Sequence, residues 1–243
     1  MIIQPFSFAT LKLALAEGWR VANATRAVSI AYSLIFVLGG LLIIGGLLAR
    51  GMTPFVIAAA GGFMLVGPVI LAGFFGIAQA FESGRPVKLG AIVAGFGNAA
   101  PALWALSLVC GLLFMIFVTD AAILYAYMIG RTPIWLLEVI PATASVLGFV
   151  KWAVVSGLVV AFLLFTVSSF SVPLLCERRI SLVGAIVTSV RVVFGNFPQA
   201  IFWAFLLSTV TIASVLLLPL LPLTLPWLAY ASRALYRQVF PSP

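Results

Sequence analysis

The sequence contains no histidine and only five acidic residues, so many of the side chains used in catalysis and metal binding are missing. Zinc, copper and haem sites draw on histidine and clustered cysteine, and Ser-His-Asp or Cys-His catalytic groups require histidine. The two cysteines, Cys110 and Cys176, lie in separate apolar segments, where cysteine usually packs as a small hydrophobic residue. We therefore expect no enzymatic activity, no metal site and no cofactor.

Charge is equally scarce. Charged residues make up 7% of the 243 residues and hydrophobic residues 64%, and the mean hydropathy is +1.29. This composition leaves too little polar surface to cover a water-soluble protein. Several uncharged runs exceed the roughly 20 residues that a helix needs to cross a bilayer core. The sequence predicts an all-α, polytopic membrane protein with a single integral membrane domain over residues 1–243.

The net charge is +8, but the basic residues are scattered at the ends of apolar runs. Such side chains typically reach toward the lipid headgroups, whereas a nucleic-acid-binding surface gathers them on one face. We expect the partners to be the lipid bilayer and other membrane protein subunits, and no nucleic acid. The predicted interfacial anchors are Arg178, Arg179, Arg191, Arg233 and Arg237.

The apolar runs predict six membrane-spanning helices. The last uncharged run, Val192 to Ser232, would extend about 60 Å as one helix, twice the thickness of the bilayer core, so we divide it in two. The N-terminal residues lack the pattern of a cleaved signal peptide, and we expect the first spanning helix to direct insertion. The six predicted helices are Ser29–Ala49, Pro54–Phe81, Pro101–Ile129, one contained within Val146–Cys176, Pro198–Thr211 and Ser214–Tyr236.

A short repeated pattern precedes two of the predicted helix pairs. The stretches "VKLGAIVAGFGN" and "SLVGAIVTSVRVVFGN" share "GAIV", then a Gly-Asn pair, and a proline follows each. Their narrow polar stripe is typical of a helix at the membrane surface, and a buried amphipathic helix is the alternative. Ser7 to Arg26 occupies the same place before the first pair. We interpret the chain as three parallel units, residues 7–81, 86–176 and 180–237, each a cytoplasmic interfacial helix followed by a transmembrane hairpin. Chance similarity between Gly- and Ala-rich segments is the alternative.

Six crossings bring both termini to one side of the membrane. Most lysines and arginines fall on that side, and positively charged loops remain in the cytoplasm. We therefore expect both termini in the cytoplasm. The cluster Glu177-Arg178-Arg179 then marks the point where the fourth helix returns to water, and it needs no catalytic role.

Asp120 is the one acid well inside a predicted spanning helix. A buried carboxylate in a membrane is costly and usually faces a partner. Lys151, early in the next helix, is its predicted ion-pair partner. A proton or cation relay and a contact with another subunit are the alternatives.

Small residues recur every fourth position at Ala72, Gly76 and Ala80. At this spacing they allow two helices to approach closely. We interpret this stripe as a helix-packing surface.

Two tracts, "GFMLVGPVILAGFFGIAQAFESGRP" (Gly62 to Pro86) and "FSVPLLCERRISLVGAIVTSVRVVFGN" (Phe170 to Asn196), carry a family resemblance. With Gly18-Trp19 and the closing "WLAYASRALYR", the chain resembles a bacterial family of six-helix integral membrane proteins, domain of unknown function 2189. The resemblance implies the same architecture and a place in the bacterial inner membrane. Some relatives are labelled as associated with cytochrome c oxidase, which suggests a respiratory partner. Relatives often have histidines in the C-terminal tract, where this chain has none.

These observations favour a non-enzymatic accessory or assembly subunit of a larger, respiratory membrane complex. The alternative is a small transporter or channel for an apolar or lipid-like substrate, because proline-interrupted helices and parallel repeats occur in transporters. An intramembrane enzyme is the weakest hypothesis, since no two carboxylates are predicted to share a site.

Overall fold

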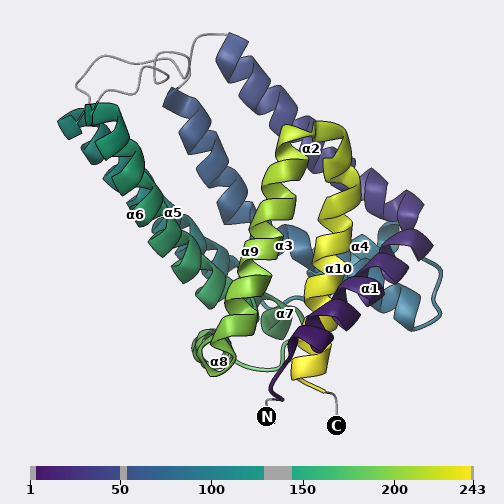
Figure 1. Cartoon of the computed structure of the whole chain (residues 1–243). Coiled ribbons are helices and arrows are strands. Elements are labelled where there is room, and N and C mark those ends of the chain that lie inside the picture. The colour runs from purple at the N-terminus through teal and green to yellow at the C-terminus, as the bar shows by residue number, and fades with distance from the viewer. Residues whose placement is uncertain (1–3, 50–53, 129–143, 242–243) are drawn as a thin grey trace.

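The protein is described here by a computed structural model that covers residues 4–49, 54–128 and 144–241. All regular structure within these residues is helical, and the chain is all-α (Figure 1). In chain order the elements are α1 (Phe8–Ala24), α2 (Arg26–Ala49), α3 (Pro54–Glu82), α4 (Leu89–Asn98), α5 (Ala102–Met128), α6 (Ala144–Ser168), α7 (Ser171–Cys176), α8 (Leu182–Gly195), α9 (Phe197–Leu216), the short 3-10 helix η1 (Leu218–Leu220) and α10 (Leu221–Val239).

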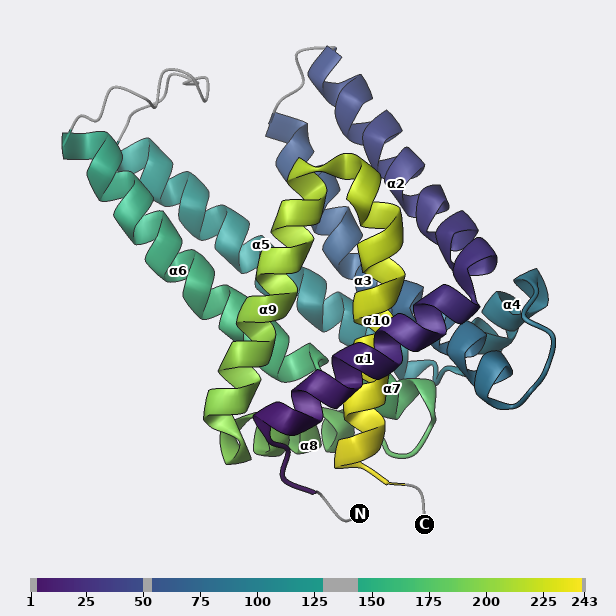
Figure 2. The ribbon, with the colours of Figure 1, turned by 45° about the vertical axis from the view of Figure 1, so that its right-hand side comes forward.

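The long helices form three consecutive pairs, α2 with α3, α5 with α6, and α9 with α10. A shorter helix precedes each pair, namely α1, α4 and α8. The short helices lie toward the end of the molecule that carries both termini (Figures 1 and 2). The chain ends meet there, because the backbone N–H of Gln4 donates to the Val239 carbonyl at 3.0 Å.

Each short helix packs against the second helix of another pair. Helix α4 contacts α3, α8 contacts α6, and α1 contacts α10, which it crosses in Figure 2. The pattern is cyclic, because the first short helix rests on the last long one. Three parallel units would produce this arrangement.

Two of the short helices begin at serine caps. The Ser7 hydroxyl accepts from the backbone N–H of Thr10, and the Thr10 hydroxyl accepts from the N–H of Ser7 in return. At α8 the Ser181 hydroxyl accepts from the N–H of Gly184. Such caps satisfy N–H groups that have no partner within the helix, so both starts follow from local sequence.

Proline moves two of the predicted helix boundaries. The run Val146–Cys176, predicted to contain one helix, holds most of α6 and all of α7 as separate helices, because Pro173 has no N–H to donate to the carbonyl of Ser169. The predicted turn between Thr211 and Ser214 is also wrong. Helix α9 continues to Leu216 and the chain turns at η1, which contains Pro219 and is followed by Pro222 in the first turn of α10. The predicted end at Ile129 lies outside the described residues.

Within the described residues, four helical stretches are long and apolar enough to cross a membrane. Helix α10 is not among them, and the described apolar part of α3 is shorter, at Gly67–Glu82. The four stretches are Arg26–Ile43, Ala102–Leu124, Leu147–Cys176 and Phe197–Ser214. The chain therefore has the helices of a multi-pass membrane protein.

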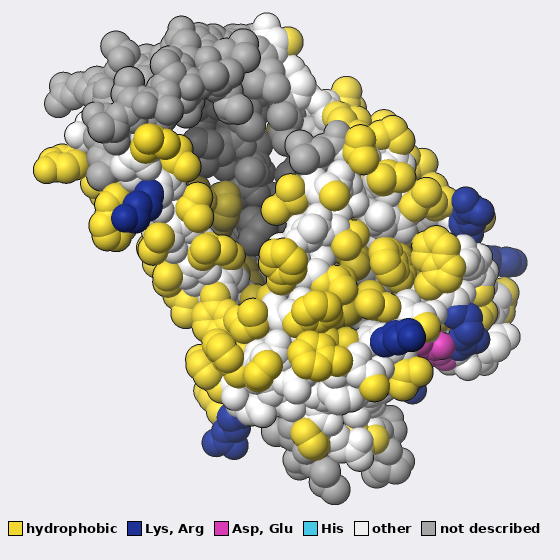
Figure 3. Space-filling model, viewed as in Figure 1, with side chains coloured by type: hydrophobic (Ala, Val, Ile, Leu, Met, Phe, Trp, Pro, Cys, Tyr) yellow, Lys and Arg dark blue, Asp and Glu magenta, His cyan; other side chains and the backbone are white. Residues whose placement is uncertain are grey.

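Hydrophobic side chains cover the long helices on the face seen in Figure 3, whereas most of the visible lysine and arginine side chains lie toward its lower and right-hand edges. Large apolar residues such as Trp104, Leu158 and Phe205 are more than half exposed. Apolar side chains at such positions suit contact with lipid.

Candidate functional site

A polar cavity of about 770 Å³ lies where α3, α4, α7 and α10 meet. Its charged lining residues are Glu82, Glu177, Arg178, Arg179, Arg233 and Arg237. Gln79, Ser83 and Asn98 add neutral polar groups, and Ala72, Phe75 and Gly76 form part of the apolar wall. We call this site the basal cavity.

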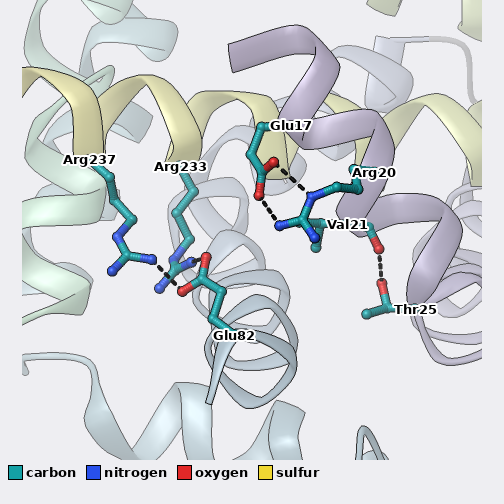
Figure 4. A network of polar contacts seen from close by, with 7 residues as sticks. All are labelled: Glu17, Arg20, Val21, Thr25, Glu82, Arg233 and Arg237. Atoms are coloured by element: carbon teal, nitrogen blue, oxygen red, sulfur yellow. Dashed lines mark hydrogen bonds and ion pairs between the residues drawn. The ribbon is translucent and has the colours of Figure 1, made fainter. Parts of the chain in front are cut away.

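Glu82 holds one side of the basal cavity together. It ends α3 and accepts from two arginines of α10, with Arg233 Nη1 on Oε1 and Arg237 Nη1 on Oε2 at 2.5 Å (Figure 4). The Arg233 side chain is only 8% exposed. A charge this deeply buried is tolerated only when it is paired and hydrogen-bonded, so Glu82 is needed to hold α10 against α3.

Glu177 makes a second connection, between α7 and α10. Its Oε2 atom accepts from Arg179 Nε at 2.8 Å and from the Tyr236 hydroxyl at 2.9 Å. The Arg179 guanidinium also lies over the Tyr236 ring, 5.6 Å from its centre. Cation–π contact and ion pairing thus order the two side chains together.

Helices α3 and α7 end in the same backbone motif, which places both glutamates. At α3, Arg85 N–H donates to Ala80 O and Gly84 N–H to Phe81 O; Gly84 has φ 65°. At α7 the corresponding donors are Arg179 to Leu174 O and Arg178 to Leu175 O. This is the Schellman motif, which requires a left-handed residue after the helix.

Arg178 occupies that left-handed position with φ 50°, where glycine is usual. The conformation costs roughly 1–2 kcal/mol for a residue with a Cβ. Its side chain donates to the carbonyls of Asn98 at 2.8 Å, Gly97 at 2.8 Å and Ala99 at 3.1 Å. These three bonds satisfy the C-terminal end of α4 and offset the strain.

The predicted anchors therefore differ from one another. Arg191 is exposed on α8, as expected for an anchor, and the Arg237 side chain is 46% exposed. Arg233 is instead buried and paired with Glu82, because α10 packs against α1, α2, α3 and α9. Arg178 donates to the end of α4, and Arg179 lies over the Tyr236 ring of α10. Sequence spacing gave no signal for these contacts, since the partners are about 60 to 150 residues apart.

The small-residue stripe lies at the contact between α3 and α4. Ala72, Gly76 and Ala80 are buried, and a Cβ at Gly76 would lie 2.6 Å from the Cα of Gly95. Contact at this distance leaves no space for a side chain on either glycine. The close approach brings Asn98 of α4 to the rim of the basal cavity.

Helix α1 approaches α10 in a similar way. A Cβ at Gly18 would lie 2.7 Å from the Cα of Ala231, so α1 and α10 are also in close contact.

Helix α1 also carries an ion pair. Arg20 donates to both carboxylate oxygens of Glu17, at 2.8 Å and 2.6 Å. That hydrogen bond lowers the pKa of Glu17, burial opposes the shift, and the positive charge of Arg20 adds to it.

A family model described as "Predicted integral membrane protein (DUF2189)" matches residues 55–177. The match covers 123 positions (177 − 55 + 1) of the 243, just over half of the chain. The protein belongs to this DUF2189 family. Both carboxylates of the basal cavity, Glu82 and Glu177, fall within the matched residues. No match was found among curated proteins or among solved structures.

In this DUF2189 protein, Asp120 and Lys151 lie on the paired helices α5 and α6. The described ion pairs do not include one between them, and Lys151 is exposed. Asp120 is half-buried, and its buried Oδ2 atom has no hydrogen-bond partner among the described residues. Pairing with Lys151 therefore stays a prediction.

Cys110 and Cys176 are both buried and carry free thiols. In the parts of the chain that the structure describes, no three His, Cys, Asp or Glu residues come close enough together to hold a metal ion. The basal cavity therefore offers arginine, carboxylate and amide groups. These groups recognise charged ligands or connect helices.

Proposed function

We propose that this DUF2189 protein is a non-enzymatic, multi-pass protein of the bacterial inner membrane that acts as an accessory or assembly subunit of a larger membrane complex. The observation that supports the proposal is the Asp120 carboxylate of α5. It lies about 12 Å from the end of that helix, eight residues at 1.5 Å each, and its buried oxygen has no partner among the described residues.

A carboxylate at membrane depth is stable when another group donates to it. The α5–α6 pair exposes large apolar side chains around this position, including Ile116, Ile123 and Val155. The Asp120 side chain as a whole is only half-buried, so a partner helix that packs there and carries a donor would pair with the carboxylate and cover the apolar side chains. The resemblance to oxidase-associated relatives makes a respiratory complex the first partner to test.

The test is affinity purification of the tagged protein from native membranes in a mild detergent. We expect a stoichiometric membrane partner to copurify with the wild-type protein and to be lost in Asp120→Asn. Thr119→Val is the matched control, because the Thr119 hydroxyl donates within its own helix to Met115 O. Isolation of the protein alone, or an unchanged yield of partner with Asp120→Asn, would contradict the proposal.

For the topology we propose six crossings with both termini in the cytoplasm. The cyclic packing of the short helices supports three equivalent units, and the four apolar stretches account for four crossings. The remaining two would be α3 and α10. Helix α10 carries Arg233 and Arg237 in its last two turns. Arg237 is 46% exposed, which suits a charge at the membrane surface, and Arg233 is paired with Glu82.

Reporter fusions test this topology. Fusions after Arg50 and Arg131 should report the periplasm, and fusions after Lys88, Arg191 and Pro243 the cytoplasm. A periplasmic reporter at Pro243 would exclude the proposed crossing of α10.

A second candidate function is transport of an apolar or lipid-like substrate. An apolar cavity of about 260 Å³ lies between α3, α5, α6, α7, α9 and α10, with Leu71, Phe165 and Trp203 in its wall. Pro68, also in the wall, lies inside α3, where proline removes a helical hydrogen bond. Such interruptions occur in transporter helices.

Flux of a fluorescent lipid analogue in reconstituted vesicles distinguishes the two functions. Transport by the purified protein that falls when Leu207, another wall residue, is changed to Trp would favour this second function. Equal flux with and without protein would exclude it.

A further inference from the structure

The basal cavity carries more positive than negative charge. Four arginines and two glutamates line it, so the balance is 4 − 2 = +2. A partly enclosed site with an excess of one sign concentrates ions of the opposite sign. The cavity therefore favours an anion.

Contacts within the protein leave this excess in place. Glu82 is one carboxylate shared between two guanidinium groups, those of Arg233 and Arg237. The Arg178 guanidinium is bound to neutral carbonyl oxygens, which satisfy its donors and leave its charge. Glu82 with its two arginines therefore has a net charge of one, and Arg178 contributes a second positive charge.

The geometry of the network also prepares Arg237 for a ligand. Its Nη1 atom donates to Glu82 at 2.5 Å, which fixes the guanidinium at the cavity wall, and nearly half of the side chain is exposed. Arginine has five donors in a planar fork and binds phosphate oxygens through two at once. Gln79 and Ser83 at the same wall are further polar side chains.

We propose that the basal cavity binds a phosphate-bearing anion, with Arg237 as its main contact and with Glu82 holding Arg237 and Arg233 in position. A cavity of about 770 Å³ is within the size range of small-molecule sites. The phosphate belongs either to an anionic phospholipid headgroup or to a free phosphate ion. This inference does not depend on the proposed partner complex, because it concerns the isolated protein.

The test uses the full chain reconstituted in nanodiscs of neutral phosphatidylcholine. One arm adds a short-chain phosphatidylglycerol and the other adds inorganic phosphate, and binding is followed by the change in melting temperature. We expect saturable binding in at least one arm, about tenfold or more weaker in Arg237→Gln, since loss of a charge-assisted contact has at least this effect. Arg237→Lys keeps the charge but loses the planar pair of donors, so its affinity should lie between those of the wild type and Arg237→Gln.

Arg191→Gln is the matched control, because Arg191 is an exposed arginine outside the basal cavity. Saturation by the lipid alone assigns the site to a headgroup, and saturation by inorganic phosphate assigns it to the free ion. The proposal is overturned if neither arm saturates. An equal loss of affinity in Arg191→Gln and Arg237→Gln also overturns it, since general surface charge would then explain the binding.

Discussion

Helix α10 is more polar than the α5–α6 pair, yet a larger share of its residues is buried. Helix α10 carries two arginines, and ten of its 19 residues are buried, among them Tyr230, Arg233 and Tyr236. In the far more apolar stretch Ala102–Leu124 of α5, only 22% of the residues are buried. In water the apolar helix would lie at the centre.

The reversal follows from the surroundings of a membrane protein. Lipid tails solvate apolar side chains as well as a protein core does, so apolarity does not drive α5 and α6 inward. Polar groups have no partners in lipid and must find them within the protein. In α10 these partners are Glu82 for Arg233, Ser29 for Tyr230 and Glu177 for Tyr236. The need of these three side chains for partners helps to explain why α10 is more buried than the more apolar α5.

The largest expected effect compares glycines in the two regions. Gly76→Ala should lower the free energy of unfolding by about 3 kcal/mol, because the new Cβ meets backbone atoms of α4 that cannot move aside. Gly157→Ala in α6 should change it by less than about 1 kcal/mol, since its Cβ meets only the ring of Phe117 at 3.3 Å. Unfolding in detergent measures both. Equal losses would show that the α5–α6 contact is as tight as the α3–α4 contact.

The next largest effect concerns the buried charge of α10. Glu82→Gln leaves Arg233 buried without a carboxylate and should cost about 3 kcal/mol of unfolding free energy. The double variant Glu82→Gln with Arg233→Met removes both charges and should recover much of the loss. Unfolding titrations of the single and double variants check this, and a double variant no more stable than Glu82→Gln would contradict the role given to the pair.

A smaller effect is expected at Asp120. Since its buried oxygen has no described partner, Asp120→Asn should raise the unfolding free energy of the isolated protein by about 1 kcal/mol. Lys151→Met should have little effect, and the two changes should add. Losses in both single variants that the double variant rescues would instead establish the predicted ion pair. A double-mutant cycle in detergent distinguishes the two outcomes.

The smallest effect is a pH dependence from Glu17. Its pKa lies below the usual value of 4.5, because Arg20 donates to the carboxylate. A lowered pKa stabilises the folded state above the unfolded-state value, and the contribution is lost as the pH falls through the folded-state pKa. The pair is exposed, so solvent screening keeps the effect small. The unfolding free energies of the wild type and of Glu17→Gln should therefore differ slightly less below about pH 4.5 than above it. A difference that grows as the pH falls would contradict this sign.

Several features of the fold could be predicted from local sequence. The long apolar runs gave the positions of the long helices, and Pro54 and Ala49 were placed at helix ends correctly. The three short helices were expected, α4 and α8 from a shared sequence pattern and α1 from its place before the first pair, and α1 and α8 begin at serine caps. The turn at η1 was misplaced, because three prolines between residues 219 and 226 allow several breaks and only packing chooses among them.

The sequence by itself determined that this protein belongs in a membrane, since its composition fixes which solvent its surface suits. It also determined where the charges fall along the chain. Only the tertiary structure decided that one cavity is surrounded by Glu82 of α3, by Arg233 and Arg237 of α10, and by Glu177, Arg178 and Arg179 of the segment between α7 and α8. Partners about 60 to 150 residues apart leave no periodic signal, and their meeting depends on close helix contacts such as Gly76 with Gly95, which only the packed chain creates.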